Sequence, residues 1–397
     1  MEVNFADRMK IVKPSAIREL LQFGANPEII SFAGGYPDPN LFPVEQLRGI
    51  FQSAISENGR NVLQYTLSNG LPRLREQLAE KMKREGTACT ADEVLILQGA
   101  QQGLDLVAKM LINAGDLIIT ENPTFLGALI AFNPFEPRYK TVPIDENGMV
   151  VDELEELLKT TPRAKLLYTT PDFHNPTGVT LSLERRKKLL QLATKYDLII
   201  LEDSPYRDLR YQGEQVPSIK SMDTEGRVIY LGSFSKILAP ALRIGWAVAS
   251  KKIVESLGLL KLAADTQTST LNMFAVSTFL DKCDFDALLL SIRNTYRHKK
   301  ALMLDTMRGE FPQEVAFTDP NGGLFTWLTF SPGFNAGEFL REKALPLAKV
   351  AYVPGATFYP VVQEPNHARM SYSLQSDEQL VEGISRLGEV LRKTGSL

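Results

Sequence analysis

The stretch from Gly232 to Trp246 reads GSFSKILAPALRIGW and carries an amine, two hydroxyls and a guanidinium in close succession. Ser233 and Ser235 can donate to phosphate oxygens, and Arg243 adds a fork of charged donors. Lys236 can form a Schiff base with an aldehyde. An aldehyde and a phosphate on one small molecule describe pyridoxal 5'-phosphate, so the stretch predicts a site for this cofactor. Taken alone, the same residues also fit a strand followed by an exposed turn rich in Ser and Lys.

Bulk properties favour small-molecule chemistry. A length of 397 residues predicts two or three lobes, and a net charge of -3 offers no broad attraction to nucleic acid or anionic lipid. No apolar run reaches transmembrane length and the N-terminus carries charges throughout, so we expect no membrane segment, no signal peptide and a cytoplasmic location. Cys89 and Cys283 are expected to be reduced thiols. The isolated His174, His298 and His367 do not suggest a metal site or a Ser-His-Asp triad.

The pattern of apolar runs predicts an α/β fold. Short, nearly continuous apolar runs at 94–97, 117–120, 166–169, 198–201, 228–231 and 246–249 alternate with helical patterns at 101–113 and 183–196, where Ser182 is the expected N-cap. This arrangement is typical of a large domain with a mostly parallel central sheet flanked by helices. Helices at 285–308 and 377–393 with short strands between them predict a smaller α+β domain. The expected division is 1–35 (N-terminal segment serving the small domain and substrate pocket), 36–290 (large cofactor-binding domain) and 291–397 (small domain).

Residues that follow the predicted strands form a coherent set, because ligands of open parallel sheets sit beyond the carboxyl ends of the strands. The turn Gly99–Gln101 opens a helix whose N–H groups can hold a phosphate. Phe125 can stack on a pyridine ring, and Asn175 can direct its amide to a phenolic oxygen. Asp203, at the end of a buried strand, can pair with a protonated ring nitrogen. The structural alternatives are a tight turn, a core phenylalanine, a plain Asn-Pro turn and an ion pair with Arg or Lys.

The ordered set Asn-Pro-x-Gly (175–178), Asp-x-x-Tyr (203–206), Ser-x-Ser-Lys (233–236) and Arg243 resembles the fold-type-I pyridoxal-phosphate aminotransferases of classes I and II over nearly the whole chain. The segments PSAIREL, SFAGGYPDPNLFP, LQYTLSNGLPRLRE and QGAQQGLDL resemble the α-aminoadipate/kynurenine, multisubstrate branch. The resemblance implies ping-pong transfer of an amino group from an L-amino acid (glutamate, 2-aminoadipate, aromatic or branched-chain) to a 2-oxo acid such as 2-oxoglutarate. It also implies a homodimer with shared active sites.

The resemblance further implies a role at each matched position. Lys236 binds the cofactor and moves the substrate proton, Asp203 keeps the ring nitrogen protonated, and Tyr206 tunes the phenolic oxygen, which makes these three the expected catalytic residues. The expected substrate-binding residues are Arg369, which would grip the α-carboxylate, together with Arg18, Gly34, Gly35 and Asn175. The expected cofactor-binding residues are Gly99, Ala100, Gln101, Phe125, Asn175, Asp203, Tyr206, Ser233, Ser235, Lys236 and Arg243, with Tyr65 reaching from a second subunit.

Three positions depart from the pattern of the relatives. Phe125 stands where many have tyrosine, which preserves stacking but loses a hydroxyl. His174 stands where glutamine is common, and it either lines the site or faces solvent. Ala241 replaces a frequent glycine and leaves Arg243 in place. The first two departures bear on substrate preference rather than on the type of reaction.

Two other functions fit the same motifs. A lyase or decarboxylase on this scaffold would break a different bond to Cα, and it would turn over without a 2-oxo acid acceptor. The effector domain of an aminotransferase-like transcription regulator would be accompanied by an N-terminal winged-helix domain. A dinucleotide-binding oxidoreductase is weaker, because Gly-x-Gly-x-x-Gly follows none of the predicted strands.

The sequence also generates a test of Arg18, which the pattern PSAIREL places in the first turn of a short helix. In the branch that the chain resembles, the matching arginine faces the distal carboxylate of acidic substrates. Arg18→Ala should lower kcat/KM for glutamate and 2-aminoadipate by about ten-fold or more, as expected for a lost charge-assisted hydrogen bond. Leucine and phenylalanine should be nearly unaffected in their own half reactions. Equal losses for acidic and apolar donors would mean that Arg18 is structural.

Overall fold

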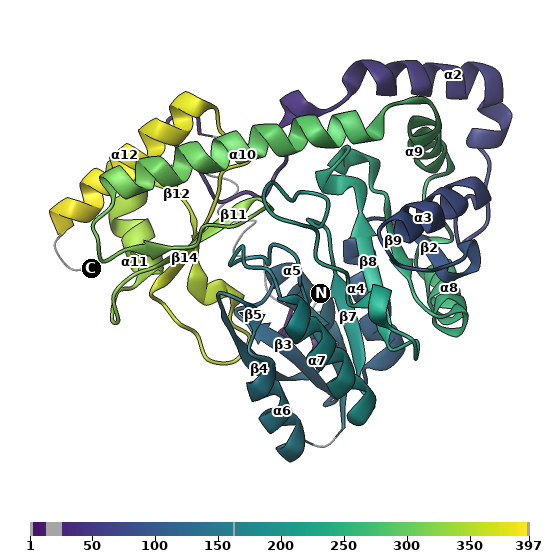
Figure 1. The fold of residues 1–397 in the computed structure, drawn as a ribbon, viewed down its shortest axis with the longest axis horizontal. Helices are drawn as coiled ribbons and strands as arrows, with labels where there is room; N and C mark the ends of the chain where they lie inside the picture. Colours follow the sequence, from purple (N-terminus) through teal and green to yellow (C-terminus); the bar gives the residue numbers. More distant parts are fainter. Residues whose placement is uncertain (1–2, 13–25, 162, 395–397) are drawn as a thin grey trace.

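The computed structural model describes residues 3–12, 26–161 and 163–394. Figure 1 shows two regions, each built around its own sheet and joined along the long helix α10 (Phe285–Glu310). A large, mostly parallel sheet with flanking helices forms one region, and a smaller antiparallel sheet with helices forms the other. The predicted α/β fold class is therefore confirmed.

The large sheet has eight strands, and its five central strands run parallel. Across the sheet the order is β2 (Val94–Leu97), β9 (Gly245–Val248), β8 (Val228–Ser233), β7 (Ile199–Asp203), β6 (Ala164–Thr169), β3 (Leu117–Asn122), β4 (Arg138–Asp145) and β5 (Gly148–Met149). Strand β9 is antiparallel to both β8 and β2, so β2 points the same way as the parallel strands. All six predicted strands are confirmed. Strand β4 was missed because most of its residues are exposed or half-buried, which leaves it without a continuous apolar run.

Helices cover both faces of this sheet. Leu104 of α4 (Ala100–Leu111) and Leu257 of α8 (Lys251–Asp265) join the core on one face, whereas Leu154 of α6 (Val151–Thr160) and Leu189 of α7 (Leu183–Lys195) join the core on the other. The predicted N-cap of α7 is confirmed, because Ser182 Oγ accepts from the backbone N–H of Arg185 at 3.3 Å. Helix α5 is Leu126–Phe132, and α2 (Val44–Val62), α3 (Pro72–Arg84) and α9 (Thr270–Lys282) group at one end of the molecule (Figure 1).

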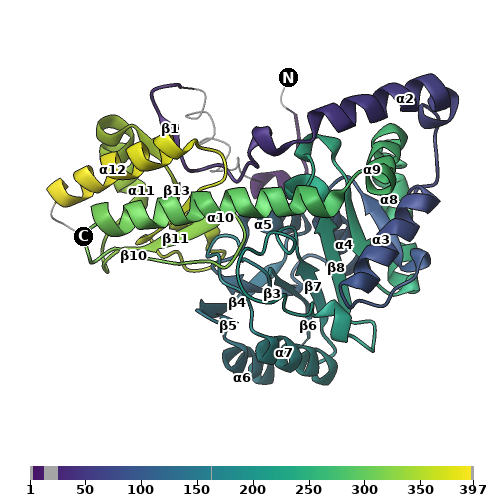
Figure 2. The same ribbon diagram turned by 45° about the horizontal axis from the view of Figure 1, so that its top comes forward.

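The smaller sheet has the order β10 (Ala316–Phe317), β11 (Phe325–Thr329), β14 (His367–Ser371) and β13 (Val353–Pro354), all antiparallel. Helix α12 (Asp377–Thr394) lies alongside α10 in both Figure 1 and Figure 2, and α11 (Ala336–Phe339) continues into the π-helical segment η9 (Leu340–Ala348). Strand β1 (Ile30–Ser31) pairs with β12 (Val350–Ala351), so the N-terminal segment joins this region. The division at residues 35 and 290 stays a prediction, and its second boundary falls inside α10.

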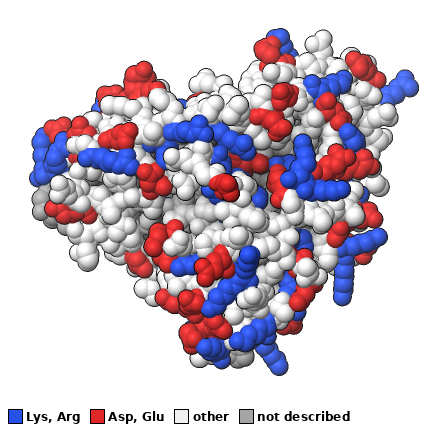
Figure 3. All heavy atoms as spheres, viewed as in Figure 1, with Lys and Arg blue, Asp and Glu red and all other residues white. Residues whose placement is uncertain are grey.

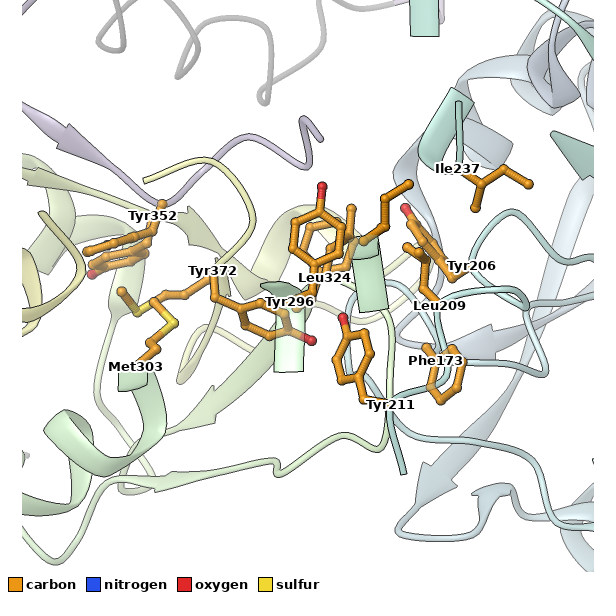
Figure 4. Packing of buried hydrophobic residues seen from close by; sticks show 14 of the residues in the cluster. Phe173, Tyr206, Leu209, Tyr211, Ile237, Tyr296, Met303, Leu324, Tyr352 and Tyr372 are labelled. Carbon is orange, nitrogen blue, oxygen red and sulfur yellow. The ribbon is translucent and has the colours of Figure 1, made fainter. Parts of the chain in front are cut away.

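One hydrophobic core runs through the junction of the two regions. Figure 4 shows Tyr206, Leu209 and Tyr211 on the large-sheet side facing Leu324, Tyr296 and Tyr372 on the other. All six are buried, and the Tyr372 hydroxyl donates to the carbonyl of Gly322 at 3.2 Å. A shared core of this kind holds the two regions in a defined relation, which a site built from both requires.

The surface carries charges of both signs. On the face shown in Figure 3, basic and acidic side chains are interspersed rather than segregated. Within residues 3–12, 26–161 and 163–394, the structure contains no helix with the length and hydropathy to cross a bilayer.

A buried ion-pair cluster supports the loop between β6 and α7. Asp172 is fully buried and accepts from Arg186 at 2.8 Å and from Arg207 at 2.9 Å. Burial by itself would raise the pKa of Asp172, but the two guanidinium groups outweigh burial and lower this pKa to about 2. The cluster ties the loop that contains Asn175 to α7 and to the segment after β7.

We predict that Asp172→Ala lowers the free energy of unfolding at pH 7 by about 3 to 5 kcal/mol, because it removes the buried carboxylate that both guanidinium groups contact. Since the folded-state pKa lies below the ordinary 3.8, the wild-type protein loses this contribution as the pH falls from about 4 through about 2, so the difference should shrink in acid. Urea unfolding at several pH values measures the effect. Asp152→Ala, which removes an exposed partner of Lys188, is the control and should have a far smaller effect.

Candidate active site

Polar side chains gather where the parallel strands of the large sheet end. Asp203 is the last residue of β7, Ser233 is the last residue of β8, and Gly99 follows β2 at the same edge. Lys236 ends η7 (Phe234–Lys236), the short 3-10 turn that β8 leads into. The edge that the sequence predicted therefore holds these residues together.

Asp203 is a buried carboxylate that has a hydrogen-bond partner at only one of its two oxygens among the described residues. Its Oδ2 accepts from the hydroxyl of Tyr168 at 2.9 Å, whereas Oδ1 has no partner among the described residues. Burial raises the pKa of Asp203 to about 7, helped by the nearby Glu121 and opposed by the Tyr168 hydrogen bond. The expected structural alternative, an ion pair with Arg or Lys, is not present in the described part of the chain.

Lys236 is half-buried and lies beside the N-terminal segment. Its Nζ donates to the carbonyl of Gly35 at 2.8 Å. Burial, followed by the positive charges of Arg369 and Arg243, lowers the pKa of Lys236 to about 8. A lysine with this pKa is partly unprotonated near neutral pH, as a nucleophile or base must be.

Arg369, Asn175 and Tyr206 form a chain of contacts from the small sheet to the large one. Arg369, in β14, donates from Nη1 to Oδ1 of Asn175 at 2.8 Å, and Asn175 Nδ2 donates to the Tyr206 hydroxyl at 3.3 Å. The guanidinium lies 4.2 Å above the ring of Phe325 and 5.1 Å from that of Phe358. Burial lowers the pKa of Arg369 to about 10, so it stays charged at neutral pH. Its Nε has no hydrogen-bond partner in the described residues.

Ser233, Ser235, Arg243 and Gly99 form a cradle of donors. Arg243 Nη1 donates to Ser235 Oγ at 3.5 Å, and Ser233 Oγ accepts from the backbone N–H of Ser235 at 3.1 Å. Gly99 caps α4 with a φ of 76°, and a Cβ there would lie 2.6 Å from Nη2 of Arg243. Gly99 thus provides both the left-handed turn and the room for the arginine.

The remaining predicted cofactor residues lie beside this cradle. Ala100 is the first residue of α4, and Gln101 donates from Nε2 to the carbonyl of Gly127 at 2.7 Å. The ring of Phe125 occupies the space that a Cβ at Gly127 would need, so Phe125 and Gln101 meet at the start of α5.

Tyr65 is 78% exposed, and no hydrogen bond or ion pair joins its side chain to the other predicted site residues within the described part of the chain. Its role in a second subunit stays a prediction. Arg18 lies outside the described residues. Gly35 does reach the site, because its carbonyl accepts from Lys236 and its Cα packs against Phe325, and Gly34 precedes it in the chain.

Comparison with known proteins agrees with this geometry. The sequence model of the family described as aminotransferase class I and II matches residues 33–387.

The chain belongs to the class I and II aminotransferase family.

The aminotransferase is 40% identical to aromatic-amino-acid aminotransferase 1 of Thermococcus litoralis over 99% of this chain and 95% of that protein. Its structure resembles that of the kynurenine aminotransferase of Pyrococcus horikoshii, with a TM-score of 0.94, 38% identity, and coverage of 99% of this chain and 98% of that one. It also resembles the α-aminoadipate aminotransferase of Thermus thermophilus, with a TM-score of 0.91, 38% identity, and coverage of 98% and 97%. These similarities confirm the predicted family and the fold-type-I architecture.

The structure adds residues to the aminotransferase site that the sequence did not single out. The hydroxyl of Tyr168 donates to Asp203. The sequence feature that could have identified Tyr168 is a hydroxyl-bearing side chain within an otherwise apolar buried strand. Glu121 is buried at the end of β3 and accepts from the Thr169 hydroxyl and the Thr170 N–H. Glu121 could have been identified from the same sequence feature as Asp203, which is a carboxylate at the end of a buried strand.

His174 does not face solvent, so that alternative is wrong. It is 1% exposed, and its Nδ1 lies 2.8 Å from the hydroxyl and 3.4 Å from the backbone nitrogen of Thr177. Nε2 lies 3.2 Å from Oε2 of Glu121, at an angle outside hydrogen-bond geometry. His174 therefore stabilises the loop that carries Asn175. In the described part of the chain, no three His, Cys, Asp or Glu side chains are placed to hold a metal ion.

Two features fit a ligand with a phosphate and a protonated ring nitrogen. The free Oδ1 of Asp203 can accept a charged N–H, which would remove the cost of leaving a buried acceptor unpaired. The glycine-capped N-terminus of α4 and the arginine beside it can bind a phosphate dianion.

We predict that Asp203→Asn stabilises the cofactor-free aminotransferase at pH 8. A pKa raised from 3.8 to about 7 means that the folded state binds this proton more tightly than the unfolded chain, so wild-type stability falls as the pH rises from about 4 to about 7. The gain should reach at most about 4 kcal/mol at pH 8 and vanish near pH 4, as measured by urea unfolding.

The control for this prediction is Asp223→Asn. Asp223 is also shielded from solvent, but its pKa is lowered because hydrogen bonds from Val228 and Lys220 outweigh burial. Its removal should therefore destabilise the protein at pH 8. A destabilised Asp203→Asn protein at pH 8 would mean that Asp203 has a partner in the folded state.

Proposed function

We propose that this aminotransferase uses pyridoxal 5'-phosphate, bound through Lys236 and Asp203, to move the amino group of an L-amino acid to a 2-oxo acid. The observation that carries the proposal is the buried carboxylate of Asp203, with one oxygen unpaired among the described residues, on the same sheet edge as a half-buried lysine whose pKa is lowered. The aminotransferase of Thermus thermophilus was solved with N-(5'-phosphopyridoxyl)-L-leucine, and the Pyrococcus enzyme with PMP. Both are relatives of the same fold and family.

In this proposal the phosphate is held by Ser233, Ser235, Arg243 and the N-terminus of α4 from Gly99 to Gln101. Phe125 would stack on the ring, and the free Oδ1 of Asp203 would accept the ring N–H. Pyridoxal phosphate, when bound, supplies an aldehyde that takes up an amino group and a ring that delocalises the electrons released at Cα. The residues around it determine which bond to Cα is broken.

Arg369 is the residue proposed to hold the substrate. Its planar guanidinium can make two parallel hydrogen bonds to the α-carboxylate, and its position over Phe325 and Phe358 fixes the plane of that grip. The backbone of Gly34 and Gly35 lies alongside, because Gly35 contacts Phe325. The α-carboxylate is thereby held at a defined place relative to Lys236.

Lys236 is proposed to carry the substrate proton. Its lowered pKa leaves part of the amine free to accept the proton from Cα at neutral pH, and the same amine returns a proton at the end of the step. The Tyr206 hydroxyl accepts from Asn175, which leaves its own proton available for the phenolic oxygen of the cofactor. Burial raises the pKa of Tyr206 to about 12, so the hydroxyl keeps that proton. Both half reactions use the same lysine, so ping-pong kinetics follow.

The proposed donors are glutamate, 2-aminoadipate, aromatic and branched-chain amino acids, with 2-oxoglutarate as acceptor. The support is the similarity to proteins named for aromatic amino acids, kynurenine and α-aminoadipate. Arg18 is proposed to select acidic side chains. A cytoplasmic location and the absence of nucleic-acid and membrane partners stay predictions.

The central experiment reduces the holoenzyme with borohydride and maps the labelled peptide. The label should lie on Lys236, and Lys236→Ala should lose about 10²- to 10⁴-fold in rate, the usual contribution of a general base. Lys252→Ala, at an exposed lysine of α8, is the control and should keep full activity. A donor panel with and without 2-oxoglutarate decides the reaction type, because turnover without the acceptor would identify a lyase.

A homodimer with shared sites is proposed from the exposure of Tyr65. Leu63 and Leu67 on either side are 69% and 57% exposed, so this segment presents apolar surface that a second copy can cover.

Mixing Tyr65→Ala chains with Lys236→Ala chains tests the shared site. Each variant alone should be weak, whereas the hybrid contains one intact site made from the lysine of one chain and the tyrosine of the other. Activity should therefore rise on mixing and refolding. No rise, or full activity of a dilute monomer in a sedimentation-controlled assay, would contradict shared sites.

A further inference from the structure

The segment Ala33–Asp38, here called the strap, crosses the site without regular secondary structure of its own. Phe32, just before it, donates to the carbonyl of Ala351 and accepts from the N–H of Ser371, which fixes the entry of the strap on the small sheet. Beyond that point the strap is held by side chains rather than by a strand ladder. Its position therefore depends on those side-chain contacts.

Two cations of the site donate to carbonyls of the strap. Arg369 Nη2 donates to Ala33 at 2.7 Å, and Lys236 Nζ donates to Gly35 at 2.8 Å. Gly35 also packs closely on Phe325, since a Cβ there would lie 2.6 Å from the ring. Any displacement of the strap changes the surroundings of both cations.

The far end of the strap is anchored by a buried ion pair. Asp38 Oδ2 accepts from Lys299 Nζ, in the middle of α10, at 2.6 Å, and the two side chains are 7% and 8% exposed. Lys299 also donates to the carbonyl of Ser373 at 3.2 Å, and Ser373 Oγ donates to the carbonyl of Tyr36 at 2.6 Å. The N–H of Asp38 donates to the hydroxyl of Tyr296, one turn earlier on α10, at 3.0 Å.

We propose that Asp38 and Lys299 are a positioning pair that sets the place of the strap over the site and, through the strap, the affinity for the amino-acid substrate. The inference rests on the proposed function of Arg369 and Lys236.

The contacts on each side of the pair give the physical reason. Asp38 and Lys299 are buried and hydrogen-bonded, so loss of one charge leaves the other uncompensated in the interior, and the anchor is lost rather than weakened. The strap then keeps its entry at Phe32 and its contacts with Arg369 and Lys236, but its far end loses the ion pair with α10 and retains only the hydrogen bonds to Tyr296 and Ser373, so that end can shift. A shift of about an ångström in the strap would misplace the carbonyls that contact Arg369 and Lys236, and this would weaken binding of the substrate.

The test compares Asp38→Asn with the wild-type holoenzyme. The amide keeps the size of the side chain and can still accept from the N–H of Asn40, a contact that Asp38 Oδ1 makes at 2.9 Å, but the charge pair is lost. KM for the amino donor should rise about ten-fold while kcat changes less than about three-fold. The reason is that the strap contributes equally to binding of the substrate in its ground state and in the transition state. Hydrogen exchange of the peptide that contains residues 30–40 should become faster in the cofactor-free protein as well.

Lys300→Met is the matched control. Lys300 is the next residue of α10 and is equally buried, but it pairs with Asp319 at 2.6 Å and donates to the carbonyl of Pro320, away from the strap. This variant should lower the melting temperature while leaving KM and the exchange of the strap unchanged. If Asp38→Asn fails to fold, Lys299→Gln removes the pair from the helix side, and the same two measurements apply.

The positioning pair is refuted if Asp38→Asn alters KM no more than Lys300→Met, if the losses in substrate affinity and in kcat are equal, or if exchange of the strap is unchanged. Failure of the proposed function is a separate result. A wild-type protein without transaminase activity would remove that function, whereas the exchange experiment on the cofactor-free chain would still decide whether the pair holds the strap.

Discussion

The unpaired carboxylate of Asp203 is the constraint on which the site depends. Burying a carboxylate without a cation costs free energy. A single hydrogen bond from Tyr168 offsets only part of this cost. The strand that carries Asp203 is buried on both faces, so the side chain cannot turn to solvent. A structure that retains such a group at the end of a central strand is prepared for a charged partner that is not part of the chain.

The two cations of the site, the half-buried Lys236 and the buried Arg369, are also held without a carboxylate partner among the described residues. Lys236 and Arg369 have lowered pKa values because burial disfavours their charge. Each is compensated mainly by backbone carbonyls and aromatic rings rather than by carboxylates. Carbonyl oxygens and ring faces stabilise a cation without neutralising it, which leaves positive charge for the carboxylate of a substrate. The site is electropositive where the substrate would bind and acidic where the ring nitrogen would lie.

Both regions of the molecule are required for this arrangement. The large sheet supplies Asp203, Ser233 and the loop of Asn175, whereas Arg369 comes from the small sheet and Gly35 from the N-terminal segment. The buried Asp172 cluster holds the Asn175 loop, and α10 spans both regions in Figure 2 and anchors the strap through Lys299. The continuous core of tyrosines and leucines in Figure 4 keeps these parts at fixed distances. Substrate affinity is thus linked to contacts far from the reacting atoms.

The sequence by itself determined the fold class and six of the strands of the large sheet, and it placed the serines, the lysine and the arginine of the predicted site close together along the chain, because these depend on local patterns. Continuous apolar runs predict strands buried on both faces, and Ser-x-Ser-Lys followed by Arg243 keeps its donors within eleven residues of sequence. Strand β4 was missed because most of its residues are exposed or half-buried, so it lacks that pattern. Only the tertiary structure decided which distant residues meet: Tyr168 at Asp203, Glu121 at His174, Phe325 under Arg369, and Asp38 at Lys299. Such contacts join residues up to 261 positions apart, and no local periodicity or motif encodes them, because they arise from the pairing of strands and the packing of elements that are distant in the sequence.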